Sequence, residues 1–327
     1  MQTALAGRRP QRLSPDRSAG SALTESKAFA PAKVNLFLHV GAPSADGYHP
    51  LCSLMMFANI GDNLSLRPAA SQNFTIEGDF GGMLESDSNN LVVRARDAIL
   101  AAAGVRDPTF ALTLCKSLPI ASGLGGGSSD AAAALRLVRS ALGLRVDPSL
   151  VLEIAATLGS DVPACVKALP VIATGRGDQL QRSPPLPDLN VVLANPGAPS
   201  PTGAVYRAYD RAVAAQGANS PAWPDRLAGP SDVVRFLTNT RNDLENAAIH
   251  LQPAIGEVLA ALSASPETMF ARMSGSGATC FALCADAVSA SALANRLGSQ
   301  APGWWVRAGR LGFVDLGAGS LGLDPHA

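Results

Sequence analysis

The sequence has no excess charge of either sign and no long hydrophobic run. Its 26 basic and 26 acidic residues give a formal net charge of +0, so nothing steers the whole chain toward nucleic acid or an anionic membrane. The Ala- and Leu-rich stretch 131–144 is interrupted by Arg136 and Arg139 and falls short of the roughly 18 apolar residues that a transmembrane helix needs. We therefore expect no nucleic-acid partner and no membrane partner, and an anionic ligand must be held by local groups.

Paired cysteines are also missing. The five cysteines are an odd number and include no Cys-x-x-Cys pair, which argues against a disulfide framework and against a zinc site. We expect reduced, buried thiols. The five are Cys52, Cys115, Cys165, Cys280 and Cys284.

The first 27 residues lack the apolar segment of a secretory signal. They carry several arginines among Ser and Ala, which leaves a plastid transit peptide as one alternative. Asp16 and Glu25 interrupt that pattern. The expectation is therefore a disordered extension over 1–27 of a bacterial cytoplasmic protein.

Length and composition predict a two-domain enzyme. The chain has 327 residues, about two domains at the usual size of roughly 150 residues each. Hydrophobic residues make up 47% and charged residues 16%, with 31 Gly and 24 Pro, as in compact, turn-rich proteins. The Pro-rich stretch Ser183–Pro187 divides an N-terminal domain, 28–182, from a C-terminal domain, 183–327. Strands and helices without regular alternation favour an α+β fold over a doubly wound sheet.

Hydrophobic spacing predicts the elements near the start of the chain. Val34–Val40 alternates as in a half-buried strand, with Lys33, Asn35, Phe37 and His39 on its second face. A turn at Gly61-Asp62 should separate two strand-like runs, 51–60 and 62–66. Helices are expected over 90–103, 130–142, 148–158, 254–262 and 289–297, strands over 110–114, 191–194, 280–283 and 304–311, and a mobile surface loop over 214–231.

The strongest local signal is the segment Gly123–Ser129, called the glycine loop below. It contains no lysine, so it is not a Walker A loop, and Ser128 stands where a dinucleotide fingerprint has its third glycine. Residues without Cβ let phosphate approach the backbone, and the free N–H groups and dipole at a helix start favour negative charge. The loop therefore predicts a phosphate site, with Ser128 or Ser129 capping the helix. A flexible loop with an ordinary cap is the alternative.

Three motifs in order extend this signal. Pro119–Ala131 is similar to the middle motif of the GHMP kinases, a family named for galactokinase, homoserine kinase, mevalonate kinase and phosphomevalonate kinase. Ala30–Leu36 and Met273–Ala278 resemble the family's other two motifs. The resemblance runs from about residue 29 to about residue 312. It implies a two-domain α+β GHMP kinase fold with a ferredoxin-like C-terminal domain, and phosphorylation of a small-molecule hydroxyl by ATP.

The tetrad Asp46–His49 and the segment Leu158–Pro163 narrow the resemblance within the family. They resemble the member that phosphorylates the 2-hydroxyl of a cytidyl diphosphate substrate in the non-mevalonate route to isoprenoid precursors. A kinase of mevalonate-type substrates would need a different sequence at Asp46–His49. A catalytically dead sensor of the same fold is the second alternative, and retention of Lys33 and Asp161 argues against it.

The resemblance assigns the catalytic roles to Asp161 and Lys33. Asp161 would accept the proton of the attacking hydroxyl or orient it, without a large pKa shift. Its position after Gly159 also suits a plain helix N-cap. Lys33 would lie beside Asp161 and offset charge on the transferred phosphoryl group, whereas a strand lysine is otherwise a solvated side chain.

The resemblance also assigns the substrate contacts. Asn35 would hydrogen-bond the substrate, Tyr48 and Tyr206 would lie against the cytosine, and His49 or its backbone would pair with the base edge. Packing of Tyr48 and His49 after a turn is the alternative.

The nucleotide contacts follow in the same way, and phosphoryl transfer adds Mg²⁺. The metal ligands stay open among Asp130, Ser128, Ser129 and water, and the oligomeric state is not predicted. A helix cap is the alternative for Asn90, and Ser276 would support the site through a tight turn. The expected ATP-binding residues are Pro119, Gly123, Leu124, Gly125, Gly126, Gly127, Ser128, Ser129, Asn90 and Lys116.

Overall fold

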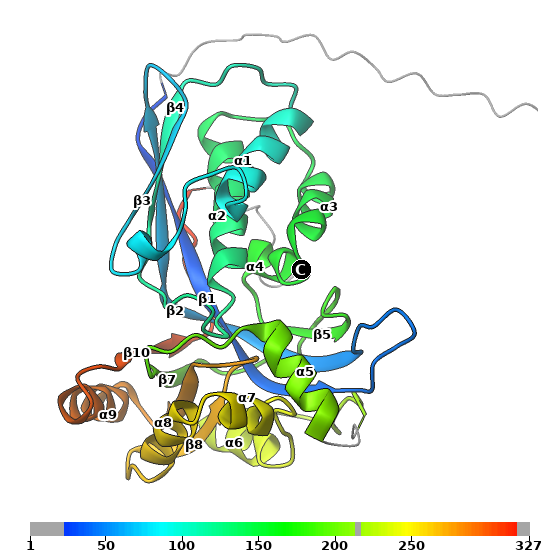
Figure 1. Cartoon of the computed structure of the whole chain (residues 1–327), viewed down its shortest axis with the longest axis vertical. Helices are drawn as coiled ribbons and strands as arrows, with labels where there is room; N and C mark the ends of the chain where they lie inside the picture. The colour runs from blue at the N-terminus through cyan, green and yellow to red at the C-terminus, as the bar shows by residue number, and fades with distance from the viewer. Residues whose placement is uncertain (1–22, 213–216, 319–327) are drawn as a thin grey trace, which may run out of the picture.

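A computed structural model describes residues 23–212 and 217–318, and it is a mixed structure of helices and strands (Figure 1). The predicted α+β class is confirmed. The strands are β1 Ser26–Val40, β2 Leu51–Pro68, β3 Asn73–Glu77, β4 Phe110–Cys115, β5 Val171–Gly175, β6 Gln179–Arg182, β7 Leu189–Asn195, β8 Thr268–Met273, β9 Cys280–Cys284 and β10 Trp305–Leu311. The helices are α1 Leu91–Ala102, α2 Gly126–Ala141, α3 Pro148–Leu158, α4 Val162–Lys167, α5 Thr202–Ala212, α6 Pro230–Leu237, α7 Glu245–Leu251, α8 Ala254–Ser263 and α9 Ala287–Gln300, with a 3-10 turn at Gly81–Met83.

A long antiparallel ribbon of β1 and β2 runs through both halves of the molecule (Figure 1). The sheet order is β3-β4-β2-β10-β7-β9-β8, with β1 and β5 also paired to β2, and β6 paired to β5. Helices α1 to α4 pack on the half with β3 and β4, and α5 to α9 pack on the other half (Figure 1). Residues of β2 therefore take part in both halves, since β2 pairs with β4 in one half and with β10 in the other.

The strand β2 is continuous through Gly61 and Asp62, so the predicted turn there is wrong. A Cβ at Gly61 would lie 2.2 Å from the carbonyl oxygen of Ala30. Glycine is needed here because the backbone of β1 passes very close, and not because the chain reverses. Asp62 consequently lies inside the sheet and is fully buried.

The strand β1 is buried on both faces, and its side-chain alternation is broken. The pairing with β2 shifts register between Asn35 and Phe37. Such a bulge adds one residue and reverses which face the following side chains occupy. Leu38 therefore lies on the side of Lys33 and Asn35, and Phe37 packs in the opposite core with its ring 4.9 Å from His39. The predicted common face is therefore divided into two pairs: Lys33 and Asn35 share one face of β1, and Phe37 and His39 lie together on the other.

Helix α2 begins at Gly126, four residues before the predicted start at Asp130. Its N-cap is Gly125, which has φ +64°, and no side chain caps the helix. The predicted cap by Ser128 or Ser129 is therefore wrong. Glycine adopts the left-handed conformation without steric cost, and this allows the chain to enter the helix while it is still in the glycine loop.

The last described residues return to the N-terminal half. Phe29 N donates to Leu316 O at 3.0 Å, and Ala318 N donates to Lys27 O at 2.8 Å. Val314 and Leu316 are buried in the same core as α1 and α2. The strand β1 already begins at Ser26, and residues 1–22 of the predicted extension lie outside the described residues. The predicted domain boundary after residue 182 stays a prediction, although β6 ends there.

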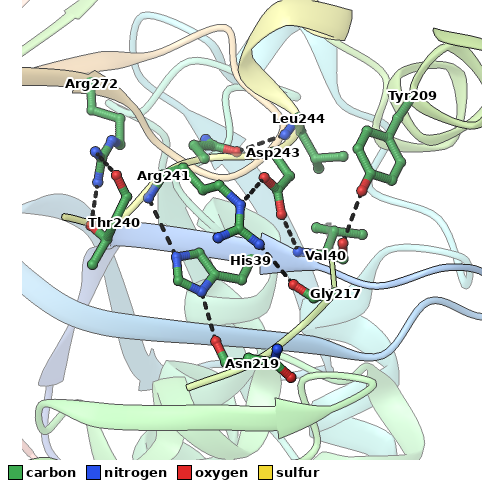
Figure 2. A network of polar contacts seen from close by, with 11 residues as sticks. His39, Val40, Tyr209, Gly217, Asn219, Thr240, Arg241, Asp243, Leu244 and Arg272 are labelled. Atoms are coloured by element: carbon green, nitrogen blue, oxygen red, sulfur yellow. Dashed lines mark hydrogen bonds and ion pairs between the residues drawn. The ribbon is translucent and has the colours of Figure 1, made fainter. Parts of the chain in front are cut away.

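A buried polar network joins the end of β1 to the segments around it (Figure 2). The Asp243 carboxylate accepts from Val40 N at 2.7 Å, and the Tyr209 hydroxyl donates to Val40 O at 2.9 Å. His39 Nδ1 lies 2.8 Å from Asn219 O, and burial lowers the pKa of this imidazole. Arg241 donates to Gly217 O at 2.7 Å. The network fixes α5 and residues 217–219 of the predicted 214–231 loop against β1, and the last two residues of that predicted loop belong to α6.

The five thiols are free, and four of them are buried while Cys115 is partly exposed. Among residues 23–212 and 217–318, no helix has both the length and the apolar character to cross a membrane.

Candidate active site

A cavity of about 1180 Å³ lies between the glycine loop, the start of α1, β1 and α5. Its wall includes every predicted site residue except Leu124 and Ser129. The fourteen that line it are Lys33, Asn35, Tyr48, His49, Asn90, Lys116, Pro119, Gly123, Gly125, Gly126, Gly127, Ser128, Asp161 and Tyr206.

Leu124 and Ser129 instead attach the glycine loop to β1. The Leu124 side chain is buried in the core, and its carbonyl accepts from Lys33 N at 2.8 Å. The Ser129 hydroxyl donates to Pro31 O at 2.6 Å and is fully buried. Their side chains therefore do not face the cavity.

Lys33 and Asp161 form an ion pair in the cavity wall. Lys33 Nζ lies 2.8 Å from Asp161 Oδ2 and 2.9 Å from Asn35 Oδ1. The side chain of Lys33 is 7% exposed and that of Asp161 is 28% exposed. Asp161 occupies the N-cap position of α4 but makes no capping hydrogen bond. Lys33 is therefore not a solvated strand lysine, and Asp161 stands at the predicted N-cap position without capping the helix through its side chain.

Asn35 is held from three sides. Its amide Nδ2 donates to Ser53 Oγ at 2.7 Å, while its backbone N donates to Ser274 Oγ at 3.1 Å. Ser274 Oγ in turn donates to Gly123 O at 3.0 Å. The third motif thus connects β1 to the glycine loop, and a Cβ at Gly123 would lie 2.3 Å from Ser274 O. This close packing fixes the loop beside Lys33.

Asn90 caps α1, as its alternative interpretation predicted. Its Oδ1 accepts from Val92 N at 2.9 Å, and its Nδ2 donates to Glu85 O at 2.9 Å. The residue also lines the cavity, so the cap places it beside the glycine loop.

Lys116 lies between two buried carboxylates. Its Nζ is 2.5 Å from Asp62 Oδ2 and 2.7 Å from Asp130 Oδ2. Burial lowers the pKa of Lys116, but the charges of Asp130 and Asp62 outweigh it and the net shift is upward. Burial raises the pKa of Asp130 to about 7, and Asp130 Oδ1 has no hydrogen-bond partner. The charged form of Lys116 is therefore favoured, and burial favours the neutral form of Asp130.

Another part of the cavity wall carries aromatic residues. His49 Nδ1 lies 2.8 Å from Gly41 O, and Nε2 lies 3.2 Å from Asp210 Oδ1. Its ring centroid is 5.0 Å from that of Tyr206. Burial, with a smaller contribution from the charge of Asp161, raises the pKa of Tyr206 to about 12, so its hydroxyl is neutral at physiological pH.

Tyr48 is the exposed member of this wall, at 57%. The guanidinium of Arg176 lies 4.2 Å from the centre of its ring, a cation–π contact in the cavity wall.

Sequence patterns missed three residues of the site. Asp62 stands in a Gly-Asp pair that is typical of turns, Asp210 belongs to a helix that was not predicted, and Arg176 follows a short strand that was not predicted. One signal for Asp62 was present in the sequence, a charged residue within a strand-like run. A buried charge is rarely left without a partner, so such a residue indicates an ion pair with another segment.

Comparison with known proteins gives the family. The GHMP kinases N terminal domain model matches residues 90–168, and the GHMP kinases C terminal model matches residues 231–303. A 4-diphosphocytidyl-2-C-methyl-D-erythritol kinase of Caulobacter vibrioides (strain NA1000 / CB15N) is 54% identical over 285 residues, which covers 87% of this chain and 98% of that protein.

Solved structures agree. A crystal structure of 4-(cytidine 5'-diphospho)-2C-methyl-D-erythritol kinase has a TM-score of 0.70 and 32% identity, and the match covers 88% of this chain and 100% of that one. A homoserine kinase from Cytophaga hutchinsonii, at 18% identity and a TM-score of 0.63, shares the fold over 93% of this chain and 99% of its own. With 54% identity across nearly the whole of a relative and both domain models matched in order, this chain belongs to the GHMP kinase family.

Proposed function

We propose that this chain transfers the γ-phosphoryl group of ATP to the 2-hydroxyl of 4-diphosphocytidyl-2-C-methyl-D-erythritol. The observation that carries the proposal is the Lys33–Asp161 pair, at 2.8 Å, in the wall of a cavity that also contains the glycine loop. The printed names of relatives up to 54% identical support this substrate. ATP as phosphoryl donor follows from the kinase family.

The mechanism assigns one task to each part of the cavity. The free N–H groups at the start of α2 would hold the nucleotide phosphates, because a helix N-terminus favours negative charge. Asp161 would orient the substrate hydroxyl and accept its proton. Lys33 would hold the Asp161 carboxylate in place through their 2.8 Å contact and offset negative charge on the transferred group. Phosphoryl transfer needs little beyond such positioning and charge stabilisation.

The residues of the cavity fit a Mg²⁺ ion that is held mainly by phosphates. Among the described residues no group of three or more His, Cys, Asp or Glu could hold a metal by itself. Mg²⁺ at kinase sites takes one or two protein oxygens together with phosphates and waters, and it would neutralise phosphate charge. The Ser128 hydroxyl lines the cavity and could supply one of these oxygens. The Asp130 and Asp161 carboxylates fit less well, because the ammonium groups of Lys116 and Lys33 lie 2.7 and 2.8 Å from them.

Recognition of cytosine would come from Tyr48 and the backbone of His49. Tyr48 is largely exposed and lines the cavity, and stacking of a base on an aromatic ring contributes about 1–3 kcal/mol. Both ring nitrogens of His49 already have acceptors as neighbours. In the described part of the chain its backbone N–H and C=O have no hydrogen-bond partner. These two groups, rather than the imidazole, would pair with the base edge.

ADP release tests the proposal. The wild type should turn over 4-diphosphocytidyl-2-C-methyl-D-erythritol, and mevalonate or homoserine should give no rate above the background. If the protein phosphorylated mevalonate, the proposed substrate would be wrong, but the assignment as a kinase would stand. ATP binding without turnover of any alcohol would favour a sensor.

A further inference from the structure

The cluster of Asp62, Lys116 and Asp130 lies directly under the glycine loop. A Cβ added at Gly126 would be 2.9 Å from Lys116 Nζ and 3.8 Å from Asp62 Oδ2. All three side chains are nearly or fully buried. Removing three ionisable side chains from water is costly unless each has a partner. The burial of this cluster therefore indicates that it has a role in the site above it.

Asp62 makes more contacts than Asp130. Its Oδ2 accepts from Lys116 Nζ, and its Oδ1 accepts from the backbone N–H groups of Ser117 and Leu118 at 2.6 and 2.8 Å. Asp130 accepts a hydrogen bond from Lys116 Nζ at 2.7 Å, and its Oδ1 has no hydrogen-bond partner among the described residues. Asp62 is therefore the carboxylate of the cluster with the most hydrogen bonds. Asp130 is the group that can become neutral, because burial raises its pKa to about 7.

The contacts of Asp62 join β2 to the chain that enters the glycine loop. Ser117 and Leu118 lie between β4 and the loop, and Lys116 reaches under Gly126 at the start of α2. One carboxylate thus fixes both the approach to the loop and the ammonium group beneath it.

We propose that Asp62 is a positioning residue of the nucleotide site, which holds Lys116 and the entry of the glycine loop so that the phosphate cradle is formed before ATP binds. This inference rests on the proposed function, since it takes the loop to be the ATP site. It gives Asp62 no contact with the transferred group. The expected effect of losing Asp62 is therefore on nucleotide binding.

Four variants test this role. Asp62→Asn keeps an oxygen for the two backbone N–H groups but removes the charge beside Lys116, and Asp62→Ala removes both. Lys116→Met removes the ammonium, and Asp62→Asn/Lys116→Met removes the pair. The matched control is Asp97→Asn, because that carboxylate is 55% exposed and does not line the cavity.

Calorimetry with a non-hydrolysable ATP analogue and steady-state kinetics give the readouts. We expect Asp62→Asn to raise the Kd of the analogue and the KM for ATP about 10- to 100-fold, because a misplacement of about 1 Å can cost about 100-fold. The KM for the cytidyl substrate should stay within about twofold. Asp62→Ala should be worse than Asp62→Asn, and the double variant should resemble Lys116→Met, since groups that act together are not additive. The control should match the wild type.

Two results would overturn the inference. One is a folded Asp62→Asn variant with unchanged analogue affinity; the other is an equal rise in both KM values, which indicates general loosening of the structure. If Asp62→Asn does not fold, Lys116→Met decides, since an unchanged Kd in that variant contradicts the role of the pair. Analogue binding does not depend on the alcohol. A wild type that binds nucleotide without phosphorylating the cytidyl substrate would therefore refute only the proposed substrate.

Discussion

Replacing Asp161 by Asn tests the centre of the proposed mechanism. The amide has the size of the carboxylate and can still accept from Lys33 Nζ, which lies 2.8 Å from Asp161 Oδ2, but it cannot take a proton. Loss of a general base costs about 100-fold or more in rate, which corresponds to about 2.7 kcal/mol in the activation barrier. We therefore expect kcat to fall at least ~100-fold while the KM for ATP changes little.

The same change has a limited cost in stability. Asp161 accepts one hydrogen bond from a charged donor, worth roughly 1.5–3 kcal/mol in a buried setting. Its side chain is 28% exposed, and solvent screening reduces this to about 1 kcal/mol. A melting temperature a few degrees below that of the wild type is expected, and Lys33 keeps Asn35 as a partner.

The assay is ADP release with the cytidyl substrate, accompanied by thermal denaturation and by calorimetry with the ATP analogue. Asp188→Asn is a suitable control, because that carboxylate is exposed, pairs with Arg310 and lies outside the cavity. A folded Asp161→Asn protein that kept more than about half of the wild-type kcat would refute the base or orienting role. A loss of analogue binding equal to the loss of kcat would assign Asp161 to the nucleotide site instead.

Three further changes test other parts of the site. Gly126→Val should weaken binding of the ATP analogue in calorimetry, because a Cβ added at Gly126 lies 2.9 Å from Lys116 Nζ. Gly127→Ala should not weaken it, because a Cβ added at Gly127 lies 3.6 Å from its nearest neighbour. If both variants bound the analogue with equal affinity, the loop would not be part of the phosphate site. Tyr48→Ala should raise the KM for the cytidyl substrate about 5- to 150-fold with little change in kcat, since base stacking is worth about 1–3 kcal/mol; an unchanged KM contradicts the stacking role. The pKa of Asp130 is raised from 3.8 to about 7. Between pH 4 and pH 7 the folded protein therefore holds a proton that the unfolded chain has released. The contribution of Asp130 to the free energy of unfolding is thus fully present below pH 4 and is lost as the pH rises to 7. The melting temperature of Asp130→Asn should therefore rise relative to the wild type from pH 4 to pH 8, and a constant difference would contradict the raised pKa.

Local patterns predicted the parts of the fold that local forces determine. Helix α3 has its predicted bounds because Pro148 starts it and Asp147 caps it, and both signals lie within three residues. Strand β9 needed only an apolar run. The glycine loop was identified from its composition, and its place in the cavity follows from the helix that it begins.

Long-range contacts decided the rest. Asp62 looked like a turn residue because its partners Lys116, Ser117 and Leu118 are more than 50 positions away. The bulge in β1 depends on how β2 pairs with it, so no period-two pattern could place Phe37. The contact of His49 with Asp210 needs α5, which is tied to Val40 through Tyr209. A sequence pattern shows residue types and spacing, but not which distant segment a side chain will meet.

The return of residues 313–318 to β1 has a consequence for how the protein is made. Val314 and Leu316 complete a core that contains α1 and α2, and Gly312 N bonds to Phe57 O in β2. The ribosome adds these residues after more than 300 others, when the N-terminal half has already left the exit tunnel. Until residues 313–318 are made, the N-terminal half has an exposed apolar surface and an unpaired strand edge. Folding intermediates with these features aggregate or bind chaperones. A stop codon near residue 312 would spare every residue of the proposed active site and still leave the half that carries the glycine loop unfinished.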